Sequence, residues 1–174
     1  MVSRFRTLVA ISLAVVVAGC SGEDAGNLPA LGTRIDETTV SGISSGAYMA
    51  GQFQMAHAKI VTGAAIIAGG PYGCAESAFS GMVIGPFATA LNASKAISGC
   101  MQNSMAAWGV PNPALLADKA ETRATDGEID ATSDVLTDRV YLFSGTKDRT
   151  VVPEIVASAV EFYRRLGVPD ANIR

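Results

Sequence analysis

The chain has 174 residues, with 13 lysines and arginines against 16 aspartates and glutamates, so its formal net charge is −3. Hydrophobic residues make up 49% of it, which is enough for one domain with a packed core. The acidic balance and the lack of a basic stripe exclude nucleic acid as an expected partner. One histidine and three cysteines, without metal-ligand spacing, give no sign of a metal or another cofactor.

The first 19 residues have the form of an export signal. Arg4 and Arg6 precede an apolar stretch over residues 8–17, which is about half of the roughly 20 residues needed to span hydrocarbon. The alternative, a transmembrane helix, therefore fits less well. Removing this signal takes away two arginines and no acid, so the mature net charge becomes −5.

The four residues V-A-G-C that end at Cys20 resemble the lipobox of bacterial lipoproteins, which predicts lipidation of Cys20. Serine at the next position is typical of sorting to the outer membrane. Residues 20–33 then form a polar tether to a membrane. We expect an exported cell-envelope lipoprotein that is periplasmic, bound to the outer membrane or extracellular.

Residues 34–174 form the predicted catalytic domain, in which apolar patterning alternates between strand and helix. Strands are expected over residues 34–41, 64–68 and 140–143, helices over 45–58, 87–107, 113–124 and 153–167, and a solvated loop over 125–138. Strands separated by helices of this length indicate βαβ units. The predicted fold class is therefore α/β with a mainly parallel sheet, and residues 170–174 look like the entry to another strand.

Residues 42–46 read G-I-S-S-G, between a β-prone run and a helix-compatible run. G-x-S-x-G is the form of the nucleophile elbow of α/β-hydrolases, where a serine lies on a sharp strand-to-helix turn. Steric crowding at such a turn predicts no room for a side chain at Gly42 or Gly46. The motif predicts Ser44 as the nucleophile and the backbone amide of Ser45 as an oxyanion donor. The alternative is a chance match in a loop rich in glycine and serine.

A serine nucleophile needs a base, and the base needs a third group to orient it. Asp148 follows a predicted buried strand, at the sheet edge where α/β sites are built, so it is the candidate acid. The alternative is that Asp148 caps the helix that begins at Pro153. His57 is the only histidine, but one helix would hold it about 20 Å from Ser44, beyond hydrogen-bond reach. We therefore expect a fragment whose base lies beyond residue 174.

Cys74 and Cys100 remain if Cys20 carries a lipid, and export implies an oxidising compartment. A disulfide between them would stabilise the fold by about 3.5 kcal/mol through chain entropy. The alternative is two free, buried thiols.

Three segments together resemble the poly(3-hydroxybutyrate) depolymerase family of secreted or periplasmic polyester hydrolases: residues 40–50, 63–75 and 143–153. The resemblance implies an α/β-hydrolase in circularly permuted order, since only one strand is expected before Ser44, and truncation at the C-terminus. It also implies Ser44 as nucleophile, Asp148 as triad acid and the amide of Ser45 as one oxyanion donor.

The expected function is that of a serine esterase that hydrolyses poly(3-hydroxybutyrate) or its oligomers through an acyl-enzyme. The partners are then a polyester or oligoester substrate and, through the lipid anchor, a membrane. A general carboxylesterase similar to feruloyl esterases is one alternative. A non-catalytic, truncated envelope lipoprotein is the other.

Overall fold

The computed structural model describes residue 29, residues 31–77 and residues 84–174. Chain contacts divide the protein between Thr33 and Arg34, and the fold described here is that of the unit Arg34–Arg174. The predicted export signal, Cys20 and most of the predicted tether lie outside the described residues. In the described part, no helix is at once long and apolar enough to cross a bilayer.

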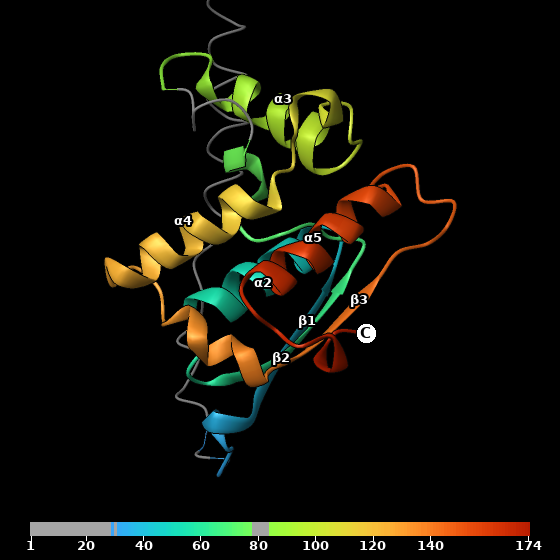
Figure 1. Ribbon diagram of the computed structural model, residues 1–174. Helices are drawn as coiled ribbons and strands as arrows, with labels where there is room; N and C mark the ends of the chain where they lie inside the picture. Colours follow the sequence, from blue (N-terminus) through green and yellow to red (C-terminus); the bar gives the residue numbers. More distant parts are fainter. Residues whose placement is uncertain (1–28, 30, 78–83) are drawn as a thin grey trace, which may run out of the picture. The chain divides into compact units, whose positions relative to one another are not determined.

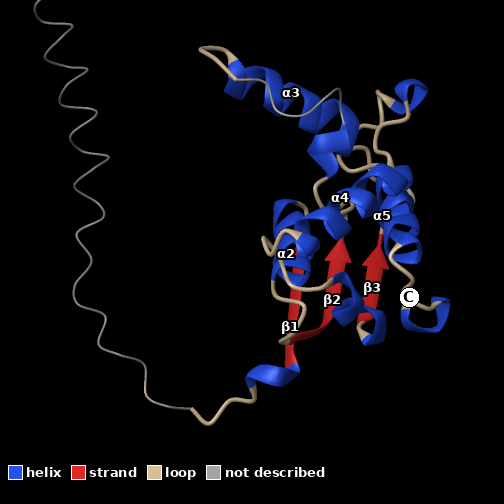
Figure 2. Cartoon of the chain, turned by 60° about the vertical axis from the view of Figure 1, so that its left-hand side comes forward, coloured by secondary structure: helices blue, strands red, loops and turns tan. Residues whose placement is uncertain are grey.

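Three parallel strands form the sheet of this unit, in the order β1, β2, β3 (Figures 1 and 2). They are Thr38–Ile43, Val61–Ile67 and Arg139–Phe143. Ile43, Ile67 and Phe143 are register partners, so the three carboxyl ends lie level at one edge of the sheet. Ile173 forms a parallel bridge with Val140, which places the last residues at the position of a further strand beside β3.

The helices of the described unit are α2 (Ser45–Ala56), α3 (Ala88–Cys100), α4 (Pro113–Thr125) and α5 (Pro153–Arg165). Proline occupies the first turn of α4 and of α5, where its fixed φ suits the helix and its missing N–H costs nothing. The side chain of Asn112 caps α4 by accepting the N–H of Leu115 at 3.1 Å. Local sequence therefore determines where α4 and α5 begin.

The core lies between one face of the sheet and helices α2, α4 and α5 (Figure 1). Buried side chains of this core include Ile66 and Val140 from the sheet, and Met55, Leu116 and Phe162 from the three helices. On the opposite face, Ile43, Tyr141 and Phe143 are 67%, 48% and 49% exposed. The described residues thus cover the sheet on one side.

The α/β class with a parallel sheet is confirmed, but several boundaries differ from the sequence prediction, and β2 begins at Val61 rather than at residue 64. Strand β1 begins at Thr38, because Ile35–Glu37 form a 3₁₀ helix, and it continues to Ile43. Helix α3 ends at Cys100 rather than at residue 107, because Asn103 adopts a left-handed φ of 55° that no helix can contain. The expected loop over residues 125–138 contains the 3₁₀ helix Thr132–Thr137.

Asp138, expected in that solvated loop, is instead part of a buried polar network. Its Oδ2 accepts a hydrogen bond from Nε2 of Gln54 at 2.7 Å, and the hydroxyl of Tyr163 donates to Oε1 of Gln54 at 2.7 Å. All three residues are at most 3% exposed. The network joins α2, the start of β3 and α5, and the bonds offset the cost of burying these polar groups.

The first prediction concerns the pH dependence of stability. Burial raises the pKa of Asp138 above 3.8, repulsion from Asp134 adds to the rise, and the hydrogen bond from Gln54 opposes it. The folded state therefore binds the proton more tightly than the unfolded state. The free energy of unfolding should fall as pH rises from 3.8 through the folded pKa.

We expect Asp138→Asn, which keeps an oxygen to accept from Gln54, to remove this component and to be more stable than the unsubstituted protein at neutral pH. Urea unfolding at acidic and neutral pH measures it. Asp126→Asn, at an exposed position, is the control. A lower stability of Asp138→Asn at neutral pH would contradict the prediction.

Candidate active site

Ser44 lies between the last residue of β1 and the first residue of α2. Its φ of 54° and ψ of −123° put a non-glycine residue in a region that costs about 1–3 kcal/mol. The N–H of Ser44 donates to the carbonyl of Ile67 at 2.9 Å, and its own carbonyl accepts the N–H of Tyr48 at 3.1 Å. The turn is thus bound to β2 on one side and to α2 on the other, with a partly exposed side chain.

Gly42 permits this turn by allowing close contact between two backbone segments. A Cβ at Gly42 would lie 2.1 Å from the carbonyl oxygen of Gly46, where no atom fits. A Cβ at Gly46 would have nothing within 4 Å. The steric prediction therefore holds for Gly42 and is wrong for Gly46, whose backbone, rather than its missing side chain, makes the contact.

Ser45 opens α2, so its amide is one of the first four N–H groups that lack an acceptor within the helix. The same end carries the positive end of the helix dipole. The loop after β2 packs closely on this first turn, since a Cβ at Gly69 would lie 2.7 Å from Cβ of Ala47. Beside Ser44 there is thus a backbone donor in a fixed position.

Asp148 follows β3 by five residues and is partly buried. Its Oδ1 accepts the backbone N–H groups of Thr150 at 2.8 Å and Val151 at 3.0 Å. The N-cap residue of α5, directly before Pro153, is Val152, and no side chain caps that helix. Asp148 is therefore not a helix cap, and its two hydrogen bonds fix a tight turn.

The structure brings Ser44 and Asp148 to the same edge of the sheet. Their strands, β1 and β3, flank β2, so the strand ends are about 10 Å apart at the usual spacing of 4.7–4.9 Å per strand. Hydrogen bonds from Ser44 N–H to Ile67 and from Ala68 N–H to Phe143, at 2.9 and 2.8 Å, extend the ladder at this edge. The two predicted site residues thus follow strands that end at one level.

His57 lies at the opposite end of α2, as the sequence predicts. Its N–H donates to the carbonyl of Phe53 at 3.0 Å, and the two rings lie with centroids 4.5 Å apart. The 12 residues of α2 separate it from Ser44 by about 18 Å at 1.5 Å per residue. His57 therefore cannot reach the hydroxyl of Ser44 from this position.

Cys74 and Cys100 form a disulfide with Cα atoms 5.9 Å apart. It joins the 3₁₀ helix Cys74–Ser77, after β2, to the end of α3. Glu76 in the same 3₁₀ helix accepts two hydrogen bonds from Nη2 of Arg123 on α4, at 2.8 and 2.9 Å. The segment after β2 is thus fixed to both α3 and α4.

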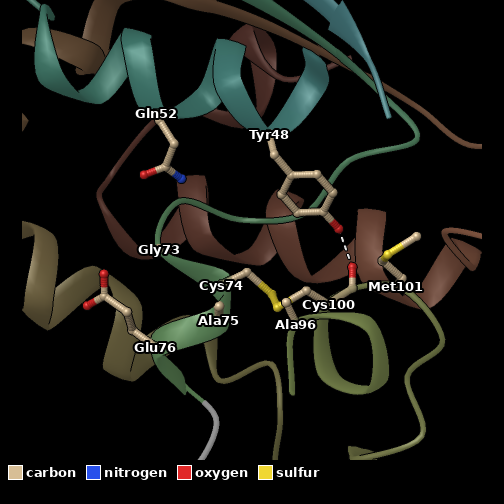
Figure 3. Close-up of a pocket in the computed structure, with 9 residues that line it drawn as sticks. All are labelled: Tyr48, Gln52, Gly73, Cys74, Ala75, Glu76, Ala96, Cys100 and Met101. Carbon is tan, nitrogen blue, oxygen red and sulfur yellow. Dashed lines mark hydrogen bonds between the residues drawn. A yellow bond between two sulfur atoms is a disulfide. The ribbon is translucent and has the colours of Figure 1, made fainter. Parts of the chain in front are cut away.

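A cavity of about 360 Å³ lies between α2 and the disulfide (Figure 3). Tyr48 and Gln52, one and two turns after Ser44, form one wall, and Ala96 and Met101 lie on the other. Ligand sites in proteins usually measure about 300–1,000 Å³. Sequence reasoning missed this wall, although the four-residue spacing of Ser44, Tyr48 and Gln52 puts all three near one face of a helix.

The hydroxyl of Tyr48 donates a hydrogen bond to the carbonyl of Cys100, beside this cavity (Figure 3). Burial raises the pKa of Tyr48 above its ordinary value. The phenol therefore stays protonated, and remains a donor, at neutral pH.

Comparisons with known proteins agree with this geometry. No protein-family model matches the sequence. The chain is 35% identical over 175 residues to a poly(3-hydroxybutyrate) depolymerase of Delftia acidovorans, covering 99% of this chain and 32% of the relative. It is 27% identical over 144 residues to a polyhydroxybutyrate depolymerase of Talaromyces funiculosus, covering 82% of this chain and 35% of that protein.

Two solved structures resemble the fold. A PHB depolymerase with a serine-to-alanine substitution, complexed with an R3HB trimer, has a TM-score of 0.62 at 25% identity, over 84% of this chain and 39% of that one. PHB depolymerase from Penicillium funiculosum has a TM-score of 0.60 at 24% identity, over 81% of this chain and 37% of that one.

A parallel sheet with a strained serine turn at its carboxyl edge defines an α/β protein similar to the α/β-hydrolases. Within that class, the chain is similar to poly(3-hydroxybutyrate) depolymerases over most of its length, in agreement with the resemblance of its three motif segments. It spans about one third of the length of the curated relatives it matches, at 32% and 35%.

The second prediction tests the glycine contact. We expect Gly42→Ala to destabilise the fold by about 3 kcal/mol or more, because overpacking a fixed backbone contact forces the strand and helix apart. Gly46→Ala is the matched control, since its Cβ meets no atom and alanine favours a helix by about 1 kcal/mol. Urea unfolding of both variants measures the difference. Equal effects would contradict the close contact at Gly42.

Proposed function

We propose that this chain carries the nucleophile, one oxyanion donor and the acid of a serine esterase that cleaves poly(3-hydroxybutyrate) or its oligomers. The observation that carries the proposal is the strained turn at Ser44, at the start of α2 and on the sheet edge that also bears Asp148. The names of the relatives and the R3HB trimer bound to one solved neighbour support the substrate class.

The geometry suits acyl transfer in two steps. Oγ of Ser44 bonds to the ester carbonyl carbon while a base takes its proton, and the amide of Ser45 donates to the oxyanion. The alcohol leaves with that proton when the carbon–oxygen bond breaks. Water then attacks the acyl-enzyme by the same route and frees the acid and Ser44.

The base is a histidine that we place after residue 174. Ile173 pairs with Val140 in parallel, N–H of Arg174 donates to the carbonyl of Val140 at 2.9 Å, and N–H of Leu142 donates to the carbonyl of Arg174 at 2.7 Å. A strand continued in that direction reaches the level of Phe143 about three residues after Ile173. A histidine that follows it would arrive beside Asp148, and the gene sequence past codon 174 tests this directly.

The cavity beside α2 is our candidate for the acyl part of the substrate. Its lining is mostly apolar, from the Cys74–Cys100 disulfide, Ala96 and Met101, while Gln52 offers an amide donor. Ser44 lies one helical turn, or about 6 Å along the axis, before Tyr48 in the cavity wall. A short aliphatic chain with ester carbonyls matches this combination of surfaces.

Export and lipidation remain part of the proposal. The basic and apolar segments of residues 1–19 and the lipobox-like sequence ending at Cys20 support a cell-envelope lipoprotein, periplasmic or on the outer membrane. A lipid anchor would hold the esterase at a surface while the tether of residues 20–33 leaves its domain free to reach a polymer.

The third prediction concerns the nucleophile. In the protein that includes the region supplying the base, we expect a phosphonylating probe to label Ser44, and Ser44→Ala to lose labelling and at least about 10³-fold in kcat with the fold retained. Mass spectrometry measures the labelling, and circular dichroism measures folding. Turnover is measured with amorphous polyester as the substrate. Ser45→Ala, which keeps the backbone amide, is the control and should retain labelling.

The alternatives give different outcomes of the same experiment. Hydrolysis of a small aryl ester, with none of amorphous polyester or its oligomers, would favour a general carboxylesterase. An intact, folded protein with unlabelled Ser44 would favour a non-catalytic lipoprotein and would overturn the proposal.

The fourth prediction tests the cavity. We expect Ala96→Phe to raise KM for an oligoester about tenfold or more, because the ring fills space that the acyl chain needs, without reducing labelling of Ser44 by a small phosphonate. Ala93→Phe on the same helix, exposed and outside the cavity, is the matched control. Equal KM values for the two variants would remove the cavity from the substrate site.

A further inference from the structure

The end of α3 is hydrogen-bonded to both sides of the candidate site. The carbonyl of Cys100 accepts the hydroxyl of Tyr48 from α2 (Figure 3), and the carbonyl of the next residue, Met101, accepts the N–H of Val152 at 2.9 Å. The disulfide from Cys100 to Cys74 anchors this segment to the chain that follows β2. One short segment thus connects elements that leave β1 and β3.

On the first side, Tyr48 moves with the turn at Ser44. Its N–H donates to the carbonyl of Ser44 at 3.1 Å. Its ring also lies against Gly70, where a Cβ would come within 2.9 Å of the ring and 3.0 Å of Ile155. The backbone of Tyr48 is thus bound to the Ser44 turn, and its ring packs closely on Gly70.

On the other side, Val152 directly follows the two residues that bind Asp148. Thr150 and Val151 donate their N–H groups to Oδ1 of Asp148 at 2.8 and 3.0 Å. Val151 is 1% exposed and belongs to a buried cluster against which Tyr48 and Met101 also pack. The position of the Asp148 carboxylate therefore follows that of residues 150–152.

The sheet by itself does not fix the distance between the two groups. Asp148 is separated from β3 by four residues, two of them, Thr146 and Lys147, exposed, and loops of this kind move more than the elements they connect. Catalytic groups need to be held within about 0.5 Å of their productive geometry. A second connection across the edge of the sheet is therefore required.

We propose that the Cys100–Met101 segment, fixed by the disulfide and bound by the Tyr48 hydroxyl, is a positioning bridge that sets the Asp148 loop relative to the Ser44 turn. Tyr48 is a positioning residue in this proposal, since its hydroxyl touches Cys100. The roles of Ser44 as nucleophile and Asp148 as acid rest on the proposed function. The physical connection between the two loops does not.

Native-state hydrogen exchange by NMR on the 174-residue chain tests the connection. We expect Tyr48→Phe to speed exchange of the Thr150, Val151 and Val152 amides about tenfold or more relative to the amides of β2, because local opening of the bridge releases them. The double variant Cys74→Ser/Cys100→Ser should act in the same way. Because exchange needs no turnover, this result stands or fails separately from the labelling of Ser44.

Tyr163→Phe is the matched control. It removes another buried tyrosine hydroxyl that bonds to α2, through Gln54, at a point remote from residues 150–152. We expect it to leave unchanged the ratio of the exchange rates of the amides of residues 150–152 to those of β2. An unchanged ratio in Tyr48→Phe, or the same increase in Tyr163→Phe, would overturn the bridge.

Kinetics in the ester-hydrolysing protein give a second readout. Tyr48→Phe keeps the ring that lines the cavity, so KM should stay within about twofold, while kcat falls roughly 10- to 100-fold through misplacement of the acid. Tyr163→Phe should leave both constants near their original values. A Tyr48→Phe enzyme with unchanged kcat would also overturn the bridge.

Discussion

The contact between Gly42 and the carbonyl of Gly46 is the constraint on which the candidate site depends. Because that oxygen occupies the space of a missing Cβ, β1 passes into α2 through one residue, and Ser44 takes a φ of 54°. The strain is offset by hydrogen bonds from the turn to β2 and within α2. A serine hydroxyl and a helix amino terminus thereby reach the sheet edge together.

The parallel register turns this local turn into a site. Since Ile43, Ile67 and Phe143 are partners, whatever follows each strand begins at the same level. Ser44 follows β1, and Asp148 follows β3. The loop that contains Gly69 and packs on α2 follows β2. The direction of the Ile173 bridge is the same, so a group that follows a strand there would join the same edge.

Features fixed by neighbouring residues could be predicted from sequence, and features fixed by distant contacts could not. The serine turn, the apolar β2 and the proline that starts α5 are all local signals, and the structure contains all three, although β2 begins three residues before its predicted start. The acidic run before β3 indicated solvent, yet Asp138 is buried. It accepts a hydrogen bond from Gln54, 84 residues away in sequence, and Gln54 in turn accepts one from Tyr163, 109 residues away. The contact of Gly46 likewise depends on folding, because its carbonyl oxygen occupies the space of the Cβ that Gly42 lacks.

Helix α3 shows why the site needs covalent support as well as a sheet. Its only buried residues, among those the structure describes, are Gly99 and Cys100 at its end, so hydrophobic burial holds it weakly. Yet the carbonyls of its last residue, Cys100, and of the next residue, Met101, accept hydrogen bonds from Tyr48 and Val152. A disulfide supplies at this point the constraint that packing does not. In the positioning bridge that we propose, the attachment of this helix at Cys74 is therefore part of the site's architecture.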